Sequence, residues 1–476
     1  MSEAIATAEA QVRDNRWVDF LGSTLPVVAP AALLAVVLAG IAPHLVLTDF
    51  WVGLVSGREV WQHGIPSTEH LTTLAAGHHW VDQQWLAQLL MYAAERIGGV
   101  GLTVALCSAT VVTCFVLCAA AAHRRGASPT VLLLFFCLAF LAGPWGVQAR
   151  TQALALPLFG LVVWLLSRDA EGKQKATFAV LPALCLWANL HGSVLLGVAI
   201  VATYGGSLVW RRQLLGLVYA LAAPLCVFVS PYGFSLFGYY ETMTVHSPFG
   251  QQIVEWQRTT PSRGTAVFFL LGAVGVLLLF ARRKSVRPFD LLLLVVTFAF
   301  GLFAIRLTPW FGLAALAVLP PLATRRNVKF QGIAAAAAAV TVAAVLLVSL
   351  AVMPGRAVPS DSWRSDRLAA VRELPTRERV LADLDLADWL LWEVPILRGR
   401  VAYDGRPELL SRAEFNDVVM RAATLAPGWR RVLAPYQLVV LGPTQAARLV
   451  RLGGWHELTN APRFVVLARA PRRSGR

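Results

Sequence analysis

Apolar residues in this chain gather in long blocks that short polar connections separate, and they do not alternate with polar residues. A helix needs about twenty apolar residues to cross the hydrocarbon core of a membrane, and many of the blocks approach that length. We therefore predict an α-helical polytopic membrane protein with about eleven transmembrane helices. The predicted spans are 21–46, 101–122, 130–143, 151–167, 178–189, 192–210, 214–230, 266–281, 291–305, 309–322 and 333–353.

Basic residues occupy alternate connections between the predicted spans. Two arginines precede the first span, and basic clusters follow every second span after it. Because cytoplasmic loops are enriched in lysine and arginine, the N-terminus is predicted to be cytoplasmic, and an odd number of spans then places the C-terminus outside. The residues that set this orientation are Arg13, Arg16, Arg124, Arg125, Arg168, Lys173, Lys175, Arg211, Arg212, Arg282, Arg283, Lys284, Arg287, Arg325, Arg326 and Lys329.

The composition supports a membrane protein. Of the 476 residues, 57% are hydrophobic and only 14% are charged, whereas a soluble globular chain carries about 25% charged residues. The net charge of +15 would suggest a nucleic-acid partner in a soluble protein. Here membrane topology accounts for the basic loops, so no nucleic-acid partner is expected. The six cysteines lie in apolar blocks, where we expect packing rather than disulfides or metal binding.

Two of the predicted outer connections are long, 47–100 and 231–264. The first contains two amphipathic stretches, 50–63 and 83–97, which are suited to lie along the membrane surface. The second is rich in aromatic and polar residues. Both long loops lie on the predicted outer face, so we expect the functional site at that face of the membrane.

The segment after residue 353 differs from the rest of the chain. Helix-like stretches at 365–373 and 412–424 alternate with short β-branched runs, which favours a small α/β fold. The runs predicted as strands are 379–381, 400–403, 437–441 and 464–468. We therefore predict two domains, a transmembrane domain at 1–353 and a soluble extracytoplasmic domain at 354–476.

Carboxylates of the first outer loop are candidates for chemistry. Asp49 follows the first span directly, where a carboxylate beside a low-dielectric wall can serve as a general base; an ordinary interfacial Asp that begins the amphipathic stretch is the alternative. Asp82 lies near His78 and His79, and this group leaves a role for a divalent metal open. No known ligand spacing fits, so neither a metal site nor a cofactor is assigned.

Arg150 and Arg306 each lie between two closely spaced spans at the predicted outer face. Lone arginines at this face depart from the positive-inside bias. A guanidinium there can bind a lipid phosphate through two parallel hydrogen bonds, or its side chain can simply extend to the lipid headgroups. The sequence alone leaves both interpretations open.

Two further pairs of polar residues lie at outer turns. Asn189 and His191 stand two residues apart at the end of the fifth span, which indicates a polar pocket or a structural histidine. Glu255 and Trp256 place a carboxylate beside an aromatic ring in the second long loop, an arrangement that can hold a sugar. As an isolated pair, this second signal is weak.

The motifs along the chain, taken in order, resemble a bacterial group of polytopic proteins. The set is Asp49-Phe-Trp51, Gly57-Arg58, Gly64-Ile-Pro66, Trp80-Val-Asp82-Gln-Gln-Trp85-Leu86, Arg150-Thr-Gln152, Trp187-Ala-Asn189-Leu-His191-Gly192, Ser230-Pro-Tyr-Gly233, Glu255-Trp256, Tyr403-Asp404-Gly405-Arg406 and Gly454-Trp455. This order is similar to that of the C-type glycosyltransferase (GT-C) superfamily, the relatives of protein mannosyltransferases and lipid A aminoarabinose transferases. The chain departs from that pattern at Glu69, where relatives usually have Asp, and at Thr151, where many have Pro.

The resemblance implies a glycosyltransferase of the plasma (inner) membrane that moves a hexose or pentose from a polyprenyl-phosphate donor to an envelope glycan, lipid or protein. It implies that Asp49 is the catalytic base, and that Arg150 or Arg306 holds the donor phosphate. We expect the substrate site to include Arg150, Asn189, His191, Glu255, Trp256, Arg306 and Asp82.

Two other functions remain as alternatives. One is a transporter or flippase of a lipid-linked sugar, a class that often shows paired repeats and broken helices. The other is a non-catalytic scaffold of the envelope, whose tail binds other proteins. A glycosyltransferase requires that Asp49, Arg150, His191, Glu255 and Arg306 meet in one cavity at the outer face, beneath the long loops and the tail.

Overall fold

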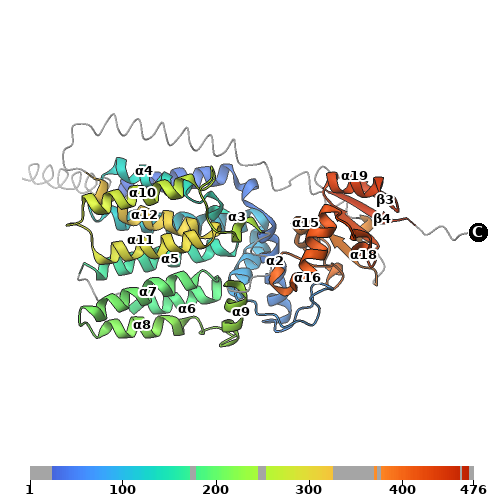
Figure 1. Ribbon diagram of the computed structural model, residues 1–476, viewed down its shortest axis with the longest axis horizontal. Coiled ribbons are helices and arrows are strands. Elements are labelled where there is room, and N and C mark those ends of the chain that lie inside the picture. Colours follow the sequence, from blue (N-terminus) through green and yellow to red (C-terminus); the bar gives the residue numbers. More distant parts are fainter. Residues whose placement is uncertain are drawn as a thin grey trace, which may run out of the picture.

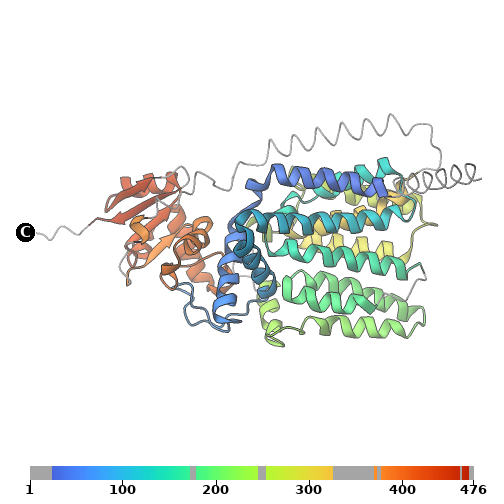
Figure 2. The ribbon, with the colours of Figure 1, turned by 180° about the vertical axis from the view of Figure 1, so that it is seen from behind.

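The computed structural model describes residues 24–171, 178–244, 253–324, 369–372, 377–460 and 464–470. Its larger part is a bundle of apolar helices, and its smaller part is a C-terminal domain built on a four-stranded sheet. The bundle helices run side by side, and the C-terminal domain lies at one end of the bundle (Figure 1, Figure 2). The predicted last span and the predicted domain boundary at residue 353 fall outside the described residues.

Apolar helices occur where the sequence predicts the first ten spans. Three described stretches are long and apolar enough to cross a membrane, namely Trp85–His123, Thr151–Asp169 and Ile305–Ala323. Shorter apolar helices complete the bundle, and the number and orientation of the spans stay predictions. The bundle contains Thr24–Gly40, η1 (Ala42–Leu45), α3 (Trp85–His123), α4 (Pro129–Leu141), η2 (Pro144–Val147), α5 (Thr151–Asp169), α6 (Val180–Leu190), α7 (Val194–Trp210), α8 (Leu215–Cys226), α10 (Ala266–Ala281), α11 (Pro288–Phe303), η5 (Ile305–Leu307) and α12 (Thr308–Ala323).

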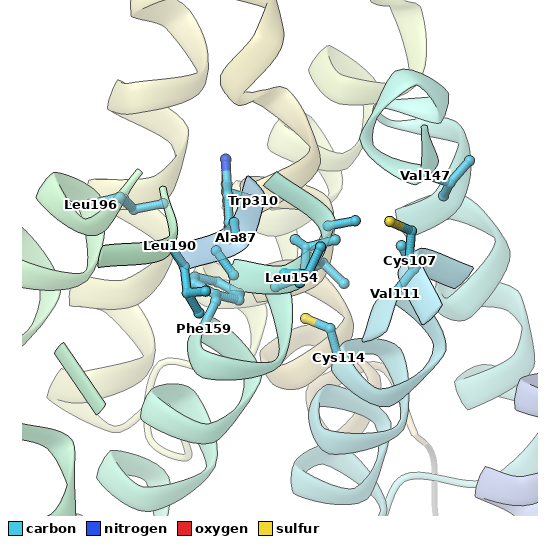
Figure 3. Packing of buried hydrophobic residues seen from close by; sticks show 14 of the residues in the cluster. Ala87, Cys107, Val111, Cys114, Val147, Leu154, Phe159, Leu190, Leu196 and Trp310 are labelled. Atoms are coloured by element: carbon cyan, nitrogen blue, oxygen red, sulfur yellow. The ribbon is translucent and has the colours of Figure 1, made fainter. Parts of the chain in front are cut away.

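Large aromatic side chains fill the centre of the bundle. Trp187 of α6 and Trp310 of α12 are fully buried with ring centroids 5.6 Å apart. Phe159 of α5 packs edge-on against Trp310 at 5.2 Å. Figure 3 shows Phe159 and Trp310 in the same layer as small and aliphatic residues of α3 and α5. This packing fixes the ends of α5, α6 and α12, and the functional residues lie at those ends.

The first long loop, residues 47–100, is largely helical. The amphipathic stretch 50–63 corresponds to α2 (Thr48–His63). The stretch 83–97 continues into the second predicted span as the single helical run α3, which bends at Gly98 and Gly99. The φ angle of Gly99 is 67°, a left-handed conformation that glycine adopts without a Cβ penalty. The predicted surface segment and the predicted span are therefore two halves of one kinked helix.

The C-terminal domain has the strand order β1-β2-β4-β3, in which β1 is parallel to β2 and the other neighbours are antiparallel. The predicted strand 400–403 is wrong as a regular strand, because only Val401 forms bridges, one with Val380 and one with Thr72 of the first long loop. The sequence did not predict β3. The elements are α14 (Ala369–Arg372), β1 (Val380–Ala382), α15 (Leu384–Glu393), η7 (Pro395–Leu397), η8 (Pro407–Leu409), α16 (Arg412–Phe415), the π-helical turn η9 (Asn416–Arg421), α17 (Ala422–Thr424), α18 (Trp429–Leu433), β2 (Leu438–Leu441), α19 (Pro443–Arg451), β3 (Trp455–Asn460) and β4 (Val465–Arg469).

The C-terminal domain is attached to the first long loop by several partly buried contacts. Arg398 forms a two-pronged ion pair with Glu59 of α2 at 2.8 and 2.9 Å. Arg58 donates to the carbonyl oxygens of Leu391 and Trp392 at the end of α15. These bonds hold α15 against α2, and they set the domain over the end of the bundle.

Candidate functional site

A cavity of about 800 Å³ lies where the helix bundle meets the C-terminal domain. Its walls come from the starts of α2, α3 and α5, the turn between α6 and α7, the ends of α9 (Ser235–Thr244) and α11, the turn η4 (Val254–Trp256), and two loops of the C-terminal domain. Sites for small molecules have volumes of about 300–1,000 Å³. Six predicted site residues line the cavity, namely Asp49, Arg150, His191, Glu255, Trp256 and Arg306.

Arg150 links two carboxylates across the cavity wall. Its Nη1 lies 3.1 Å from Asp49 Oδ2 and 3.1 Å from Glu255 Oε2. The residue precedes α5 and is only 2% exposed. Its Nε and Nη2 have no hydrogen-bond partner among the residues that the structure describes. Two nitrogens of this buried guanidinium at the cavity wall are therefore unpaired within the described part of the chain.

Glu255 carries a negative charge that is stabilised by its neighbours. Burial by itself raises the pKa of Glu255, but the guanidinium groups of Arg150 and Arg306 outweigh burial and lower this pKa below its ordinary value. The carboxylate stays ionised and holds Arg150 in place.

Arg306 lies in the turn η5, between α11 and α12. Its guanidinium carbon lies 4.3 Å from the centre of the Trp256 ring. A cation stacked on an aromatic face keeps its N–H groups at the edge, where they can donate hydrogen bonds. Trp256 therefore fixes the orientation of Arg306 while its donor edge stays usable.

His191 follows the last residue of α6, and its ring is fixed by Ser193. The backbone N–H of Ser193 donates to His191 Nδ1 at 3.1 Å, and the Ser193 hydroxyl lies 2.9 Å from the same nitrogen. Because Nδ1 accepts a hydrogen bond, a neutral ring carries its proton on Nε2. The indole of Trp187 donates to the Ser193 hydroxyl at 3.0 Å and completes this support.

Two predicted site residues do not line the cavity. Asn189 accepts a hydrogen bond from Trp85 Nε1 at 2.9 Å and donates to the carbonyl oxygens of Cys185 and Val229. These bonds tie α6 to the start of α3. Asp82 is buried behind the cavity wall, 3% exposed. Burial raises the pKa of Asp82 to about 7, although Arg406 and Gln88 oppose the shift.

The structure adds cavity residues that were not among the predicted site residues. Asp385, Arg406 and Glu408 reach the cavity from the C-terminal domain, and several glutamines line its base. The sequence contained a signal for some of these glutamines, in the Arg150-Thr-Gln152 motif and the Gln83-Gln84 pair. No local pattern links the tail residues to the cavity, because a long-range fold brings them there. Among the described residues, no group of three or more His, Cys, Asp or Glu side chains could hold a metal ion.

No protein-family profile and no curated protein matches the chain. Solved structures do match it. ArnT from Cupriavidus metallidurans, solved bound to undecaprenyl phosphate, aligns with a TM-score of 0.50 and 17% identity over 96% of this chain and 99% of ArnT. The archaeal oligosaccharyltransferase AglB from Archaeoglobus fulgidus, solved with an inhibitory peptide and a dolichol-phosphate, aligns with a TM-score of 0.55 and 12% identity over 96% of this chain and 75% of AglB.

Both matched proteins are membrane glycosyltransferases of the GT-C superfamily. At these identities, the likeness concerns the path of the chain rather than individual side chains. It extends over nearly the whole chain, so it includes both the helix bundle and the C-terminal domain. The chain therefore has the fold of the GT-C membrane glycosyltransferases.

Proposed function

We propose that this protein is a membrane glycosyltransferase that moves a sugar from a polyprenyl-phosphate donor to an acceptor of the cell envelope. The observation that carries the proposal is the position of Arg150 between Asp49 and Glu255 on a cavity beneath the C-terminal domain. This places a carboxylate next to a guanidinium with a free edge. The undecaprenyl phosphate in ArnT and the dolichol-phosphate in AglB support a lipid-phosphate donor.

Three side chains are suited to bind the phosphate of the donor. Arg150 offers Nε and Nη2, Arg306 offers its donor edge beside Trp256, and His191 offers Nε2–H. All three line the same cavity. When the bond between the anomeric carbon and the phosphate oxygen breaks, negative charge builds on the phosphate. Fixed donors in a buried site stabilise that charge and speed the reaction.

Asp49 is suited to act as the general base. Its side chain lies in the first turn of α2 and is 52% exposed toward the cavity side of the helix. In this mechanism, Asp49 takes the proton of the acceptor hydroxyl as that oxygen attacks the anomeric carbon. The electron pair of the broken bond leaves with the polyprenyl phosphate. A single displacement of this kind inverts the anomeric configuration.

The acceptor is expected to enter from the side of the C-terminal domain. Residues 384–385 and 405–408 of that domain form part of the cavity wall near Asp49. The hydroxyl of Thr48 donates to Asp385 at 2.9 Å and joins the two walls. In this arrangement, the donor lipid approaches from the bundle and the acceptor from the outer side.

Transfer of radiolabelled sugar from a panel of polyprenyl-phosphate sugars to envelope extracts tests the proposal. Asp49→Asn should reduce transfer by roughly 100-fold or more, which is the usual contribution of a general base. Asp417→Asn is the matched control, because Asp417 also pairs with an arginine but lies outside the cavity. Transfer that is absent with every donor, or equal in the wild type and Asp49→Asn, would contradict the proposal and favour a transporter or a scaffold.

A further inference from the structure

Glutamine side chains are concentrated on one part of the cavity. Those that line it are Gln83, Gln84, Gln88, Gln148 and Gln152. They come from the start of α3, the turn before α5 and the first turn of α5. Segments that are distant along the chain therefore bring uncharged amides to one place beside Arg150.

Close packing fixes the positions of these amides. Gln84 is the N-cap residue of α3, and the backbone N–H of Gln88 in the first turn donates to the Gln84 carbonyl oxygen at 3.1 Å. The Thr151 hydroxyl donates to Gln84 Oε1 at 2.6 Å and joins α3 to α5. A Cβ at Gly57 would lie 2.2 Å from the Gln88 carbonyl oxygen, so α2 also presses directly on this turn.

Two of the amides are buried without full hydrogen bonding. Gln152 is 1% exposed, and neither its Oε1 nor its Nε2 has a partner among the described residues. Gln88 is also 1% exposed, and its Oε1 lacks a partner in the same part of the chain. An unsatisfied buried amide destabilises a folded protein, and a methionine or leucine would avoid that cost. A molecule bound beside Gln88 and Gln152 would complete these hydrogen bonds.

We propose that Gln84, Gln88 and Gln152 form the subsite for the donor's sugar, and that this sugar is uncharged and rich in hydroxyl groups. The inference rests on the proposed function. An amide offers one donor group and one acceptor oxygen, and each sugar hydroxyl requires both kinds of partner. The subsite adjoins Arg150, so the sugar lies next to the phosphate that Arg150 binds.

The subsite itself offers no counter-ion to an ionised sugar. Gln84, Gln88 and Gln152 are uncharged, and Gln88 and Gln152 are each 1% exposed. A charged group that is buried without a partner costs much more free energy than a neutral hydroxyl that is hydrogen-bonded. A neutral hexose or pentose avoids that cost.

Binding of defined lipids to the purified full-length protein in detergent tests the inference. The probes are undecaprenyl phosphate alone and undecaprenyl-phosphate derivatives of mannose, glucose, arabinose, 4-amino-4-deoxyarabinose and glucuronic acid. At least one neutral sugar lipid should bind more tightly than both charged ones. Gln152→Met and Gln88→Met should weaken that binding roughly tenfold, the loss expected for one or two hydrogen bonds, while binding of undecaprenyl phosphate stays unchanged.

Gln213→Met is the control, since Gln213 is exposed in the turn between α7 and α8, away from the cavity. If a methionine variant fails to fold, Gln152→Asn and Gln88→Asn replace it. Each shortens the side chain by one methylene, which moves the amide away from the sugar, and each should cause the same selective loss of sugar-lipid binding. Tighter binding of a charged sugar lipid, or unchanged sugar binding in the variants, overturns the sugar subsite and leaves the proposed function intact. Failure of undecaprenyl phosphate itself to bind overturns the proposed function.

Discussion

Arg150 and Asp49 form an ion pair of 3.1 Å although 101 residues separate them in the chain. The same nitrogen of Arg150 also contacts Glu255. Arg150 and Arg306 together offset the charges of Asp49 and Glu255, so the two guanidinium groups attract the donor phosphate while the two carboxylates repel it. Asp49 and Glu255 therefore oppose phosphate binding even as they hold Arg150 in position, and this balance leads to the first prediction.

Glu255→Gln should bind undecaprenyl phosphate about three- to tenfold more tightly than the wild type, because it removes a charge that repels the phosphate in a partly buried site. The amide oxygen can still accept a hydrogen bond from Arg150, so its geometry is retained. Quenching of tryptophan fluorescence by added lipid measures the change. Glu241→Gln, an exposed carboxylate of α9, is the control. Weaker binding in Glu255→Gln would mean that Glu255 acts mainly by positioning Arg150.

Arg406→Met should weaken the attachment of the C-terminal domain to the first long loop. Arg406 is 5% exposed, and it pairs with Asp404 and with Glu69 at 2.7 Å. It also stacks on Trp80 of the loop at 4.2 Å. Removing one partner of a buried ion pair leaves the carboxylates uncompensated and costs about 3–5 kcal/mol. The expected result is a lower thermal midpoint and faster proteolysis between the two domains.

The matched control for Arg406→Met is Arg412→Met, a change to an exposed arginine of the same domain. Exposed substitutions usually change stability by less than about 0.5 kcal/mol, so its thermal midpoint should equal that of the wild type. Equal midpoints for both variants would show that the Arg406 cluster contributes little to the attachment of the domain.

Asp82 gives the stability of this junction a pH dependence. Burial raises its pKa from 3.8 to about 7, with Glu408 acting in the same direction and Arg406 and Gln88 opposing it. The folded state thus holds a proton that the unfolded state releases. This contribution is complete below about pH 4, declines by at most about 1.4 kcal/mol per pH unit, and is lost as the pH passes about 7.

Asp82→Asn removes this titration, so the comparison of the variant with the wild type isolates it. The thermal midpoint of the wild type minus that of Asp82→Asn should become smaller from pH 5 to pH 8. The exposed Asp417→Asn should show no such trend. A constant difference for Asp82→Asn would indicate that Asp82 is ionised throughout this range.

The sequence predicts the helices well because a hydrocarbon core demands one kind of segment. Backbone groups in lipid must be bonded internally, so an apolar block of sufficient length has few alternatives to a helix. The strand Trp455–Asn460 was missed for the opposite reason. It lies at the edge of the sheet, contains His456 and Glu457, and is fixed by pairing with β4 rather than by its own pattern.

For the candidate site too, the local sequence predicts some of the residues, and contacts between distant segments decide the others. Asp49 and Arg150 stood out as polar residues at span ends and Glu255 as a carboxylate of the second long loop, and the structure brings them into contact. Asn189 looked equally suitable, but its amide is occupied by Trp85 and two carbonyl groups. Which polar residue faces the cavity depends on helix rotation and on contacts between distant segments, and neither can be read from spacing alone.

Gly57→Ala should disturb the base of the cavity by forcing α2 away from α3. The new Cβ would lie 2.2 Å from the Gln88 carbonyl oxygen and 2.8 Å from Tyr92 Cβ, and neither of these groups is a flexible side-chain end. Overpacking of this kind costs about 1–3 kcal/mol, more than the roughly 1 kcal/mol that alanine gains over glycine as a helix former. The thermal midpoint should therefore fall, and binding of neutral sugar lipids should weaken as Gln88 moves.

Gly101→Ala is the matched control, because Gly101 also lies in a helix but has nothing within 4 Å of its ideal Cβ position. Its midpoint should be unchanged or higher, and a Gly57→Ala protein that matches it would show that α2 and α3 can separate without loss.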